Sequence, residues 1–461
     1  MKSINQIICI FTTLILLFTQ GFLSPVLGMT LKQEKKLGKE FIKIARKRYQ
    51  IITDSAIINY VNKIGNKILA VAPPQPFTYH FYVIKEDVYN AFAGPAGHVF
   101  INSGLFIAMT SEDELAGIIS HEISHVICRH ISQQYERSKT IGMATLAGVI
   151  AGVFLGAGGA ATTASALAIG SIAAGETMAL AYSREHEMQA DQIGLRYMTL
   201  AGYNGKGLLT ILKKIRGKQW FGSEQIPDYL TTHPAVEDRI SYIDTWLQQN
   251  FIKKQALSGL REFKIARFRL LALYGDLQIA INDFELAVSR DPKDPIANYC
   301  LGLTMARKGN RREAVVYIQK ALEKMALDPV LLKDLGKIYF LDGNYKAAYN
   351  ILESVTGLMA NDPDGLFYFA RTQLELKKLK GAVISFEKLI KLSPDYIRAY
   401  YFLGNTYGKL ENLGEAHYNL GIYYKKKGDQ KTARFHLNRA LKMINDSAKK
   451  KTIEKMLAKK K

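Results

Sequence analysis

The chain is poor in cysteine and histidine and has few long apolar runs, and these shortages exclude several classes of protein. Three cysteines (Cys9, Cys128 and Cys300) in 461 residues are too few for a disulfide-stapled scaffold. No set of apolar spans of about 20 residues is present, which excludes a multi-span transporter. Hydrophobic residues still make up 48% and charged residues 22%, so the chain can bury the cores of two or three ordinary domains.

Acidic residues are outnumbered, because 62 lysines and arginines face 41 aspartates and glutamates and give a net charge of +21. The excess lies mainly in residues 261–461, which carry 37 bases and 22 acids (+15), against 25 and 19 (+6) in residues 1–260. This charge suits acidic protein partners. No nucleic-acid-binding motif accompanies it, so we predict no nucleic acid partner.

The N-terminus predicts export. Lys2 precedes an uncharged, mostly apolar run of 17 residues from Ile7 to Leu23, and Ser24-Pro25-Val26-Leu27-Gly28 follows. This order is typical of a signal peptide cleaved after Gly28. The run is short for a membrane span of about 20 residues, so an uncleaved anchor is the alternative. Both interpretations place the rest of the chain outside the cytoplasm.

Residues 29–260 mix helical and strand patterns. A capping box at Ser111 and Glu114 predicts a helix that runs to about Gln133. The other expected elements are helices near 31–52 and 57–71 and strands at 78–84 and 98–101, with turn residues at 94–97.

Residues 141–175 contain no charge over 35 positions. Gly156, Gly158 and Gly159 interrupt the run near its middle and leave parts too short to span a membrane separately. We favour a pair of buried or interfacial helices over a membrane hairpin. Contact of this segment with a membrane surface stays open.

Residues 261–448 contain an internal repeat of 34 residues. A helix–turn–helix unit of this length, with small residues where helices cross, is the tetratricopeptide signature. A further unit around Gly421 is displaced by half a period, which predicts a shared or irregular helix. The lysine-rich end, 449–461, is expected to be a solvated helix or tail. The in-phase residues are Gly302, Gly336, Ala370 and Gly404, each followed twelve positions later by Ala314, Ala348, Ala382 and Ala416.

The residues His121-Glu122-Ile123-Ser124-His125 form an H-E-x-x-H motif in the helix that Ser111 caps. Spacing of four places both imidazoles on one helix face, where they can bind the same zinc ion. Glu122 lies beside them, where it can act as the general base that activates water at the zinc. Two histidines and a glutamate buried in an apolar helix without a purpose would be costly.

A catalytic zinc needs a third protein ligand and an open fourth position. The best candidate segment is 183–191, in which Glu187 and Asp191 lie four residues apart. Ala190 and Gly194 share their helix face. Such small residues would let this helix lie close against the first one.

Further motifs flank these candidates. They are Asn90-Ala91-Phe92-Ala93-Gly94-Pro95, Gly104-Leu105, Arg129-His130 after the H-E-x-x-H run, Glu187-x-x-Ala190-Asp191, Thr232-His233-Pro234 and Arg239. With the signal segment and the repeats, they make the chain resemble the HtpX-like and BepA-like zinc metallopeptidases, relatives of the CAAX prenyl endopeptidases. The likeness covers nearly the whole chain.

The resemblance implies a mainly α (α+β) architecture: a helical zincin metallopeptidase domain with a small β-sheet, then a tetratricopeptide α-solenoid. We expect a signal peptide at 1–28, the peptidase at 29–260, the repeats at 261–448 and a basic tail at 449–461. The implied location is the periplasm, and an inner-membrane anchor facing the periplasm is the alternative.

The resemblance also implies one zinc ion per chain, with His121, His125 and Glu187 as its ligands and Glu122 as the catalytic base. Asp191 would hydrogen-bond a ligand histidine or donate a proton. His233 would approach the metal as a displaceable fourth ligand, or stabilise the oxyanion.

Three neighbouring segments have secondary roles in this interpretation. Arg239 is expected to brace the loop that carries His233. His130 is expected to be an ordinary helix histidine and not a ligand. The strand at 98–102 is expected either to pair with an extended substrate backbone or to be an ordinary edge strand.

Two functions from different classes follow. The first is a periplasmic zinc endopeptidase with chaperone-like activity in quality control or assembly of outer-membrane proteins. Its partners would be unfolded or misassembled outer-membrane proteins and their assembly machinery, held by the repeats. The alternative is a chaperone or assembly factor that acts through its repeats, with a plugged metal site.

Overall fold

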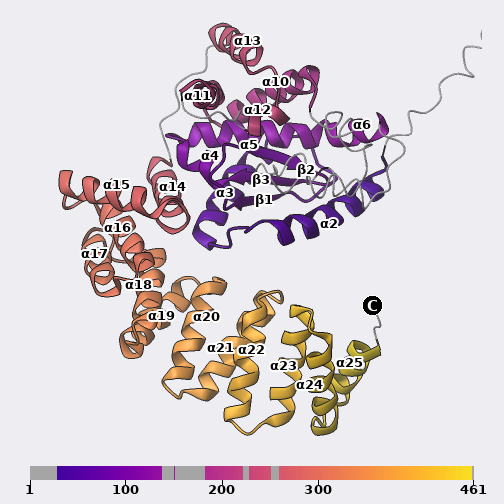
Figure 1. Ribbon diagram of the computed structural model, residues 1–461, viewed down its shortest axis with the longest axis vertical. Coiled ribbons are helices and arrows are strands. Elements are labelled where there is room, and N and C mark those ends of the chain that lie inside the picture. Colours follow the sequence, from indigo (N-terminus) through magenta and orange to yellow (C-terminus); the bar gives the residue numbers. More distant parts are fainter. Residues whose placement is uncertain (1–28, 138–149, 151–181, 222–227, 251–258, 459–461) are drawn as a thin grey trace, which may run out of the picture. The chain divides into compact units, whose positions relative to one another are not determined.

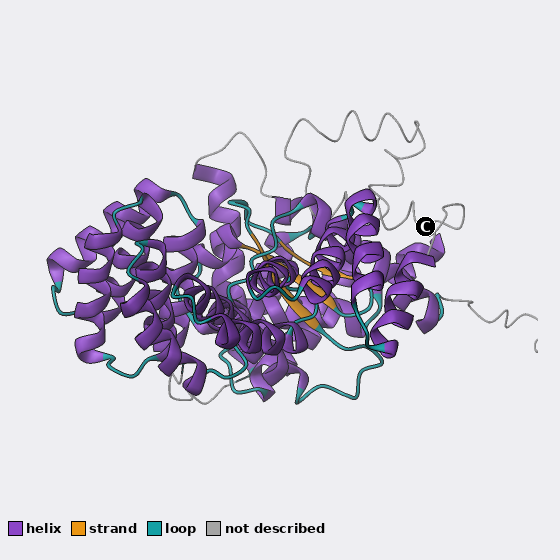
Figure 2. Cartoon of the chain, turned by 90° about the horizontal axis from the view of Figure 1, so that it is seen from below, coloured by secondary structure: helices purple, strands orange, loops and turns teal. Residues whose placement is uncertain are grey.

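A computed structural model describes residues 29–137, 150, 182–221, 228–250 and 259–458 (Figure 1). The predicted signal peptide at 1–28 and, apart from Ile150, the uncharged segment 141–175 lie outside the described residues. The chain divides into two compact units, residues 1–267 and 268–461, and the division falls within one helix. The strands, orange in Figure 2, all belong to the first unit. In the part of the chain that the structure describes, no helix is both long and apolar enough to cross a membrane.

The first unit is built from helices around one small sheet. Its described elements are α2 (Leu31–Arg48), α3 (Ser55–Leu69), β1 (His80–Ile84), β2 (Ala91–Gly94), β3 (His98–Asn102), α4 (Ser103–Ala108), α5 (Glu112–Ile127), α6 (His130–Arg137), α10 (Arg184–Leu200), α11 (Lys206–Phe221), α12 (Asp228–Thr232), α13 (Val236–Gln249) and α14 (Leu260–Tyr274).

The sheet has the order β1-β3-β2, in which β3 pairs parallel with β1 and antiparallel with β2. The sequence does not predict β2, because 94–97 are turn residues and no strand pattern precedes them. The segment 98–102 was expected to pair with substrate or to be an ordinary edge strand, and both expectations are wrong. Since β3 is hydrogen-bonded on both sides, neither of its edges is free.

Alternating side chains place the sheet between two helical layers. Phe41 of α2 packs edge-on against Phe92 and Phe100, with ring centroids 6.4 and 5.7 Å apart. These rings share one face of the sheet because side chains alternate along a strand. In Figure 1, α5 and α2 lie on opposite faces. The sheet thus supports α5 on the face opposite α2.

The helix that Ser111 caps is shorter than predicted. It ends at Ile127, and a new helix, α6, starts at His130 instead of one helix continuing to Gln133. The break lies at Arg129, whose φ is 54°. A non-glycine residue in this left-handed region cannot continue an α-helix. Nothing in the residue types at 128–130 announces the break.

Helix α10 packs closely on α5, as the small residues at 190 and 194 predict. Ala190 is fully buried. A Cβ added to Gly194 would lie only 3.1 Å from the backbone nitrogen of His121. This approach brings the acidic residues of α10 to the histidines of α5.

The second unit consists of helices alone among its described residues. After α14 they are α15 (Leu277–Arg290), α16 (Pro295–Lys308), α17 (Arg311–Lys324), α18 (Pro329–Leu341), α19 (Tyr345–Leu358), α20 (Pro363–Glu375), α21 (Leu379–Leu392), α22 (Ile397–Lys409), α23 (Leu413–Lys427), α24 (Gln430–Met443) and α25 (Ser447–Ala458). From α15 to α25 each helix packs on the next one along the chain. The predicted fold class, a helical peptidase domain with a small sheet followed by a repeat solenoid, is confirmed.

The displaced unit near Gly421 is explained by a shared helix. Helix α23 packs on α22 at Gly404, where an added Cβ would lie 2.8 Å from Leu420, and on α24 at Gly421, where it would lie 2.7 Å from Leu437. One helix therefore serves two pairs, as the half-period shift predicts. The lysine-rich end is mostly the helix α25, which buries Ile453.

Candidate metal centre

Helix α5 carries the first three candidate residues into the interior. Ser111 caps the helix by accepting a hydrogen bond from the backbone nitrogen of Glu114 at 3.3 Å. His121, Glu122 and His125 are all at most 1% exposed. Burial holds the pKa of His125 well below its usual value, so in the metal-free protein this imidazole is neutral.

Four side chains from three segments converge beside α5. His121, His125, Glu187 and His233 each offer a ligand atom, and all these atoms lie within 4.8 Å of one another. The two Nε2 atoms of His121 and His125 are 3.0 Å apart. Glu187 oxygens lie 3.4 Å from His121 Nε2 and 3.3 Å from His125 Nε2, and Nδ1 of His233 lies 3.0 Å from Glu187.

These distances match what zinc requires. Nitrogen and oxygen ligands at about 2.0–2.1 Å from a tetrahedral zinc lie about 3.3 Å from one another. The separations among His121, His125 and Glu187, and that between His121 and His233, are 3.0 to 3.4 Å and close to that spacing. Imidazole and carboxylate are also zinc's ordinary ligands. The residues present therefore fit a zinc ion.

Glu122 is fully buried, and neither of its carboxylate oxygens has a hydrogen-bond partner among the described residues. Nε2 of His233 lies 3.7 Å from Oε1 of Glu122. Burial raises the pKa of Glu122 above its usual value. A buried carboxylate with no donor is costly unless it is kept for a ligand or water, which suits a general base.

Asp191 holds the outer nitrogen of His121. Its Oδ1 lies 2.7 Å from Nδ1 of His121. Arg239 donates to the same carboxylate from Nε at 2.7 Å and from Nη2 at 2.8 Å, and the hydroxyl of Tyr242 also donates to it. Burial opposes ionisation of Asp191, but Arg239 and His121 outweigh it and lower its pKa. The geometry favours the hydrogen-bonding role over proton donation, since an ionised carboxylate has no proton to give.

The same carboxylates act on His121. Burial and Arg239 would lower its pKa, yet Asp191 and Glu187 raise it to about 9 in the metal-free protein. Burial likewise opposes ionisation of Glu187, and His233, Arg239 and His121 hold its pKa well below the usual value. The site therefore keeps both acids ionised.

Arg239 lies differently from the expectation that it braces the His233 loop. Its guanidinium contacts Asp191 and Glu187, and Nη1 lies 2.6 Å from Glu187. Its link toward the loop is indirect, through the hydroxyl of Tyr229 at 3.4 Å. Arg239 thus neutralises the acids of α10 in addition to contacting the segment before His233.

His233 is oriented by both of its ring nitrogens. Nδ1 faces Glu187 and lies 3.4 Å from Nε2 of His121, while Nε2 lies 3.2 Å from the carbonyl of Ala91 in β2. A carbonyl can only accept, so Nε2 carries a hydrogen. The carboxylate of Glu187 also only accepts, so Nδ1 would present a lone pair to the donor set only when it binds a metal. The ring also stacks on Tyr229 at 4.3 Å.

Three tyrosines around the site were not found from the sequence. Tyr182 stacks on His125 at 3.7 Å and its hydroxyl donates to the carbonyl of Ala93, while Tyr229 and Tyr242 contact His233 and Asp191. The chain contains 25 tyrosines, and none of the three at the site lies in a motif that predicts a chemical role. Only the three-dimensional packing distinguishes them.

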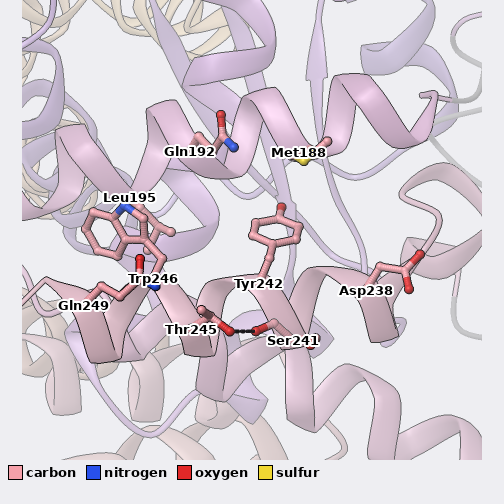
Figure 3. Close-up of a pocket in the computed structure, with 9 residues that line it drawn as sticks. All are labelled: Met188, Gln192, Leu195, Asp238, Ser241, Tyr242, Thr245, Trp246 and Gln249. Atoms are coloured by element: carbon pink, nitrogen blue, oxygen red, sulfur yellow. Dashed lines mark hydrogen bonds between the residues drawn. The ribbon is translucent and has the colours of Figure 1, made fainter.

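A cavity of about 530 Å³ adjoins the outer side of this network, between α10 and α13. Figure 3 shows Tyr242 rising from α13 toward α10 between Gln192 and Met188. Trp246 and Leu195 form its apolar end. The cavity is separated from the donor set by α10, because Glu187 and Asp191 lie on the buried side of that helix.

Comparison with known proteins identifies the first unit. Residues 58–247 match the sequence model of peptidase family M48. They contain His121, His125, Glu187 and His233. Residues 58–247 therefore form a peptidase M48 domain. Residues 310–389 match the model of subunit 3 of the anaphase-promoting complex (cyclosome), and residues 414–447 match a tetratricopeptide repeat. The predicted class of enzyme, a zinc metallopeptidase, is that of the family.

Named relatives agree with the family. The chain is 26% identical over 315 residues to the β-barrel assembly-enhancing protease of Yersinia pestis, covering 68% of this chain and 63% of that protein. It is 26% identical over 353 residues to the protein of that name in Escherichia coli, covering 72% and 68%. The mitochondrial metalloendopeptidase OMA1 of Arabidopsis thaliana is 29% identical over 221 residues, covering 48% and 41%. The predicted resemblance to the β-barrel assembly-enhancing proteases (BepA) is confirmed.

Proposed function

We propose that this protein is a periplasmic zinc endopeptidase that cleaves unfolded or misassembled outer-membrane proteins, with chaperone-like capture by its repeats. The observation that carries the proposal is the buried set of His121, His125 and Glu187 beside the unpartnered carboxylate of Glu122. The names of the relatives support the substrate class. The match to a tetratricopeptide repeat supports a protein-binding array.

The residues of the site have separable tasks. Zinc held by His121, His125 and Glu187 would supply Lewis-acid activation of water and of the scissile carbonyl. Glu122 accepts the proton of the attacking water and returns it to the leaving amine, which suits a carboxyl with a raised pKa. Asp191 keeps the hydrogen of His121 on Nδ1 and so leaves Nε2 free as a ligand.

The substrate backbone has a place to pair along β2. Among the described residues β2 is hydrogen-bonded to β3 alone, and its carbonyls at Ala91 and Ala93 accept from Nε2 of His233 and from the hydroxyl of Tyr182, contacts that an added strand would replace. We propose that an extended substrate adds to this edge, because main-chain pairing tolerates many sequences. The strand next to the site is thus β2, in place of the segment 98–102.

His233 would close the site at rest. Four protein donors fill a tetrahedral zinc, whereas a catalytic zinc keeps one position open. We propose that the loop of His233 moves away when substrate engages. Higher proteolysis by His233→Ala supports this cap; unchanged proteolysis with unchanged zinc affinity would dismiss it. Complete loss of cleavage would show that His233 acts in the reaction itself.

The decisive test is digestion of an unfolded outer-membrane protein by the purified protein. We expect one zinc per chain by elemental analysis, and cleavage that a chelator abolishes. Glu122→Gln should keep the zinc and abolish cleavage, whereas His125→Ala should lose the zinc. Purified protein without metal, or unchanged zinc content in His125→Ala, would refute the site.

The closed donor set also favours the second candidate, a chaperone or assembly factor with a plugged metal site. It predicts that Glu122→Gln suppresses aggregation of the same substrate as well as the wild type does, while neither protein cleaves it. Cleavage by the wild type alone rejects this alternative as the main function.

Export and domain limits belong to the same proposal. We propose removal of residues 1–28, a peptidase domain at 29–260, repeats at 261–448 and a basic tail at 449–461, with membrane-surface contact by 141–175 as an added possibility for the peptidase. N-terminal sequencing of the mature protein tests the cleavage. A chain that begins at Met1 would favour the inner-membrane anchor.

A further inference from the structure

His130 lies outside the donor set but is hydrogen-bonded to one of its members. His125 faces the donors with Nε2, and its other nitrogen, Nδ1, lies 2.8 Å from Nδ1 of His130. Nε2 of His130 lies 2.9 Å from Oε1 of Gln189. A continuous chain of hydrogen bonds therefore runs from Gln189 through His130 to His125. His130 is fully buried, while Gln189 is exposed at the outer end.

Only one direction of these hydrogen bonds is compatible with metal binding. The amide oxygen of Gln189 can only accept, so Nε2 of His130 carries a hydrogen and its Nδ1 carries a lone pair. That lone pair accepts from Nδ1–H of His125, which leaves Nε2 of His125 unprotonated toward the donor set. The reverse direction would put a hydrogen on Nε2 of His125, where a ligand needs a lone pair.

We propose that His130 is a positioning residue that, together with Gln189, holds His125 in the one tautomer that can bind zinc. The inference rests on the proposed zinc site and goes beyond it by assigning a task to a histidine that is not a ligand. It parallels the pairing of His121 with Asp191, but here the acceptor is a neutral imidazole. His130 cannot itself join the donors, since its Nδ1 points at Nδ1 of His125.

The break between α5 and α6 creates this contact. Residues five apart on a continuous α-helix lie about 140° apart around its axis, so their side chains do not meet. The left-handed conformation of Arg129 turns the chain and brings His130 back to His125. The side chain of Arg129 is held by Glu34 and by the carbonyl of Met29, which fixes the turn.

Helix α10 holds the other side of His130. His186, in the first turn of α10, stacks on the His130 ring with centroids 4.3 Å apart and planes 21° from parallel. Gln189 follows one turn later. The helix that supplies Glu187 to the donors therefore also fixes the ring that orients His125.

Three substitutions at one position separate acceptor chemistry from packing. In His130→Asn the amide oxygen can take the place of Nδ1, so we expect zinc affinity within about threefold of the wild type. In His130→Gln the amide reaches the Nε2 position and offers no acceptor at the δ position, and in His130→Leu no acceptor remains. Both should weaken zinc binding by about 10- to 100-fold, measured by competition with a chromophoric chelator.

The outcomes decide the proposal. Equal zinc affinity in His130→Leu and the wild type would overturn it, as would an equal loss in all three variants, which points to packing alone. If the Leu and Gln variants do not fold, nitrogen NMR of histidine-labelled, zinc-loaded wild type decides. We expect hydrogen on Nδ1 of His125 and on Nε2 of His130, and hydrogen on Nδ1 of His130 would contradict the inference. A wild type that binds no zinc refutes the proposed function instead.

Discussion

At the scale of single residues, the site residues that the sequence predicts are those whose residue type and helical spacing indicate their chemistry. Histidine is rare in this chain and the H-E-x-x-H spacing is set by the helix period, so His121, Glu122 and His125 can be picked out from the sequence. Glu187 and Asp191 follow from the same period on a second helix. His130 could not be assigned, because its role depends on a backbone break that no residue type announces.

His98 offers a pH-dependent test outside the metal site. It is partly buried on β3, stacks on His80 and lies 3.2 Å from the hydroxyl of Tyr82. Burial, His80 and Arg46 lower its pKa to about 4, against an ordinary value near 6.5 in the unfolded chain.

A lowered histidine pKa favours the neutral form in the folded state. The contribution of His98 is therefore fully present above about pH 6.5 and is lost as pH falls toward 4, by up to about 3 kcal/mol. We expect the melting temperature of His98→Gln to fall less than that of the wild type as the pH is lowered from 7 to 4. Parallel pH profiles of the two proteins would contradict the assignment. The comparison between variants cancels the titration of the zinc-site histidines.

At the scale of elements, the sequence predicts the close packing of α10 on α5 but not the pairing of β2 with β3. The small residues at 190 and 194 announce the approach of α10 to α5 because only side-chain size is involved. The strand β2 is four residues long, and two of the four are alanine and one is glycine, so it carries little β-propensity. Its place is fixed by pairing with β3, which a local pattern does not report.

The approach of α10 to α5 can be tested at Gly194. A methyl group there would press on the backbone of His121, so Gly194→Ala should destabilise the fold by about 1–3 kcal/mol and weaken zinc binding although every ligand side chain is kept. Gly217 of α11 is the matched control, since an added Cβ meets nothing within 4 Å. Gly217→Ala should stabilise by up to about 1 kcal/mol through helix propensity. Equal effects of both substitutions on zinc affinity would refute close packing as the cause.

A buried ion pair joins neighbouring helices of the repeats. Arg269 of α14 is 2% exposed and pairs with Asp334 of α18, and Tyr299 of α16 donates to the same carboxylate at 2.6 Å. Arg269→Leu should cost about 3–5 kcal/mol, because it leaves a buried carboxylate without its cation. Hydrogen exchange in α14, α16 and α18 measures the loss.

The surface pair of Arg216 and Glu237 provides the control for this substitution. Arg216→Leu should change stability by at most about 1 kcal/mol, since exposed ion pairs contribute little. If Arg269→Leu leaves exchange in the three helices as slow as in the wild type, the ion pair does not stabilise the array.

At the scale of the whole molecule, the sequence distinguishes a first half with mixed helix and strand patterns from a second half with a 34-residue repeat. The structure then locates the boundary between them more closely. Each unit has its own hydrophobic core. The first half of α14 packs on the first unit, through Phe263 against Phe106 and through Arg267, which donates to the carbonyl of Ile107. A cut at residue 261 would expose these contacts, so an experiment on the first unit keeps the whole of α14, although the division falls inside that helix and its second half pairs with α18 through Arg269.

Deletion of residues 277–461 therefore tests the division of labour. We expect the shortened protein to bind one zinc and to cleave a short unstructured peptide, because all four donors and Glu122 lie in the first unit. It should lose capture of an unfolded outer-membrane protein, since the array and most of the basic excess are removed. Pull-down of the Glu122→Gln protein, with and without the array, separates capture from cleavage. Capture that survives the deletion would place substrate recognition in the peptidase, where β2 already offers an edge for an extended backbone.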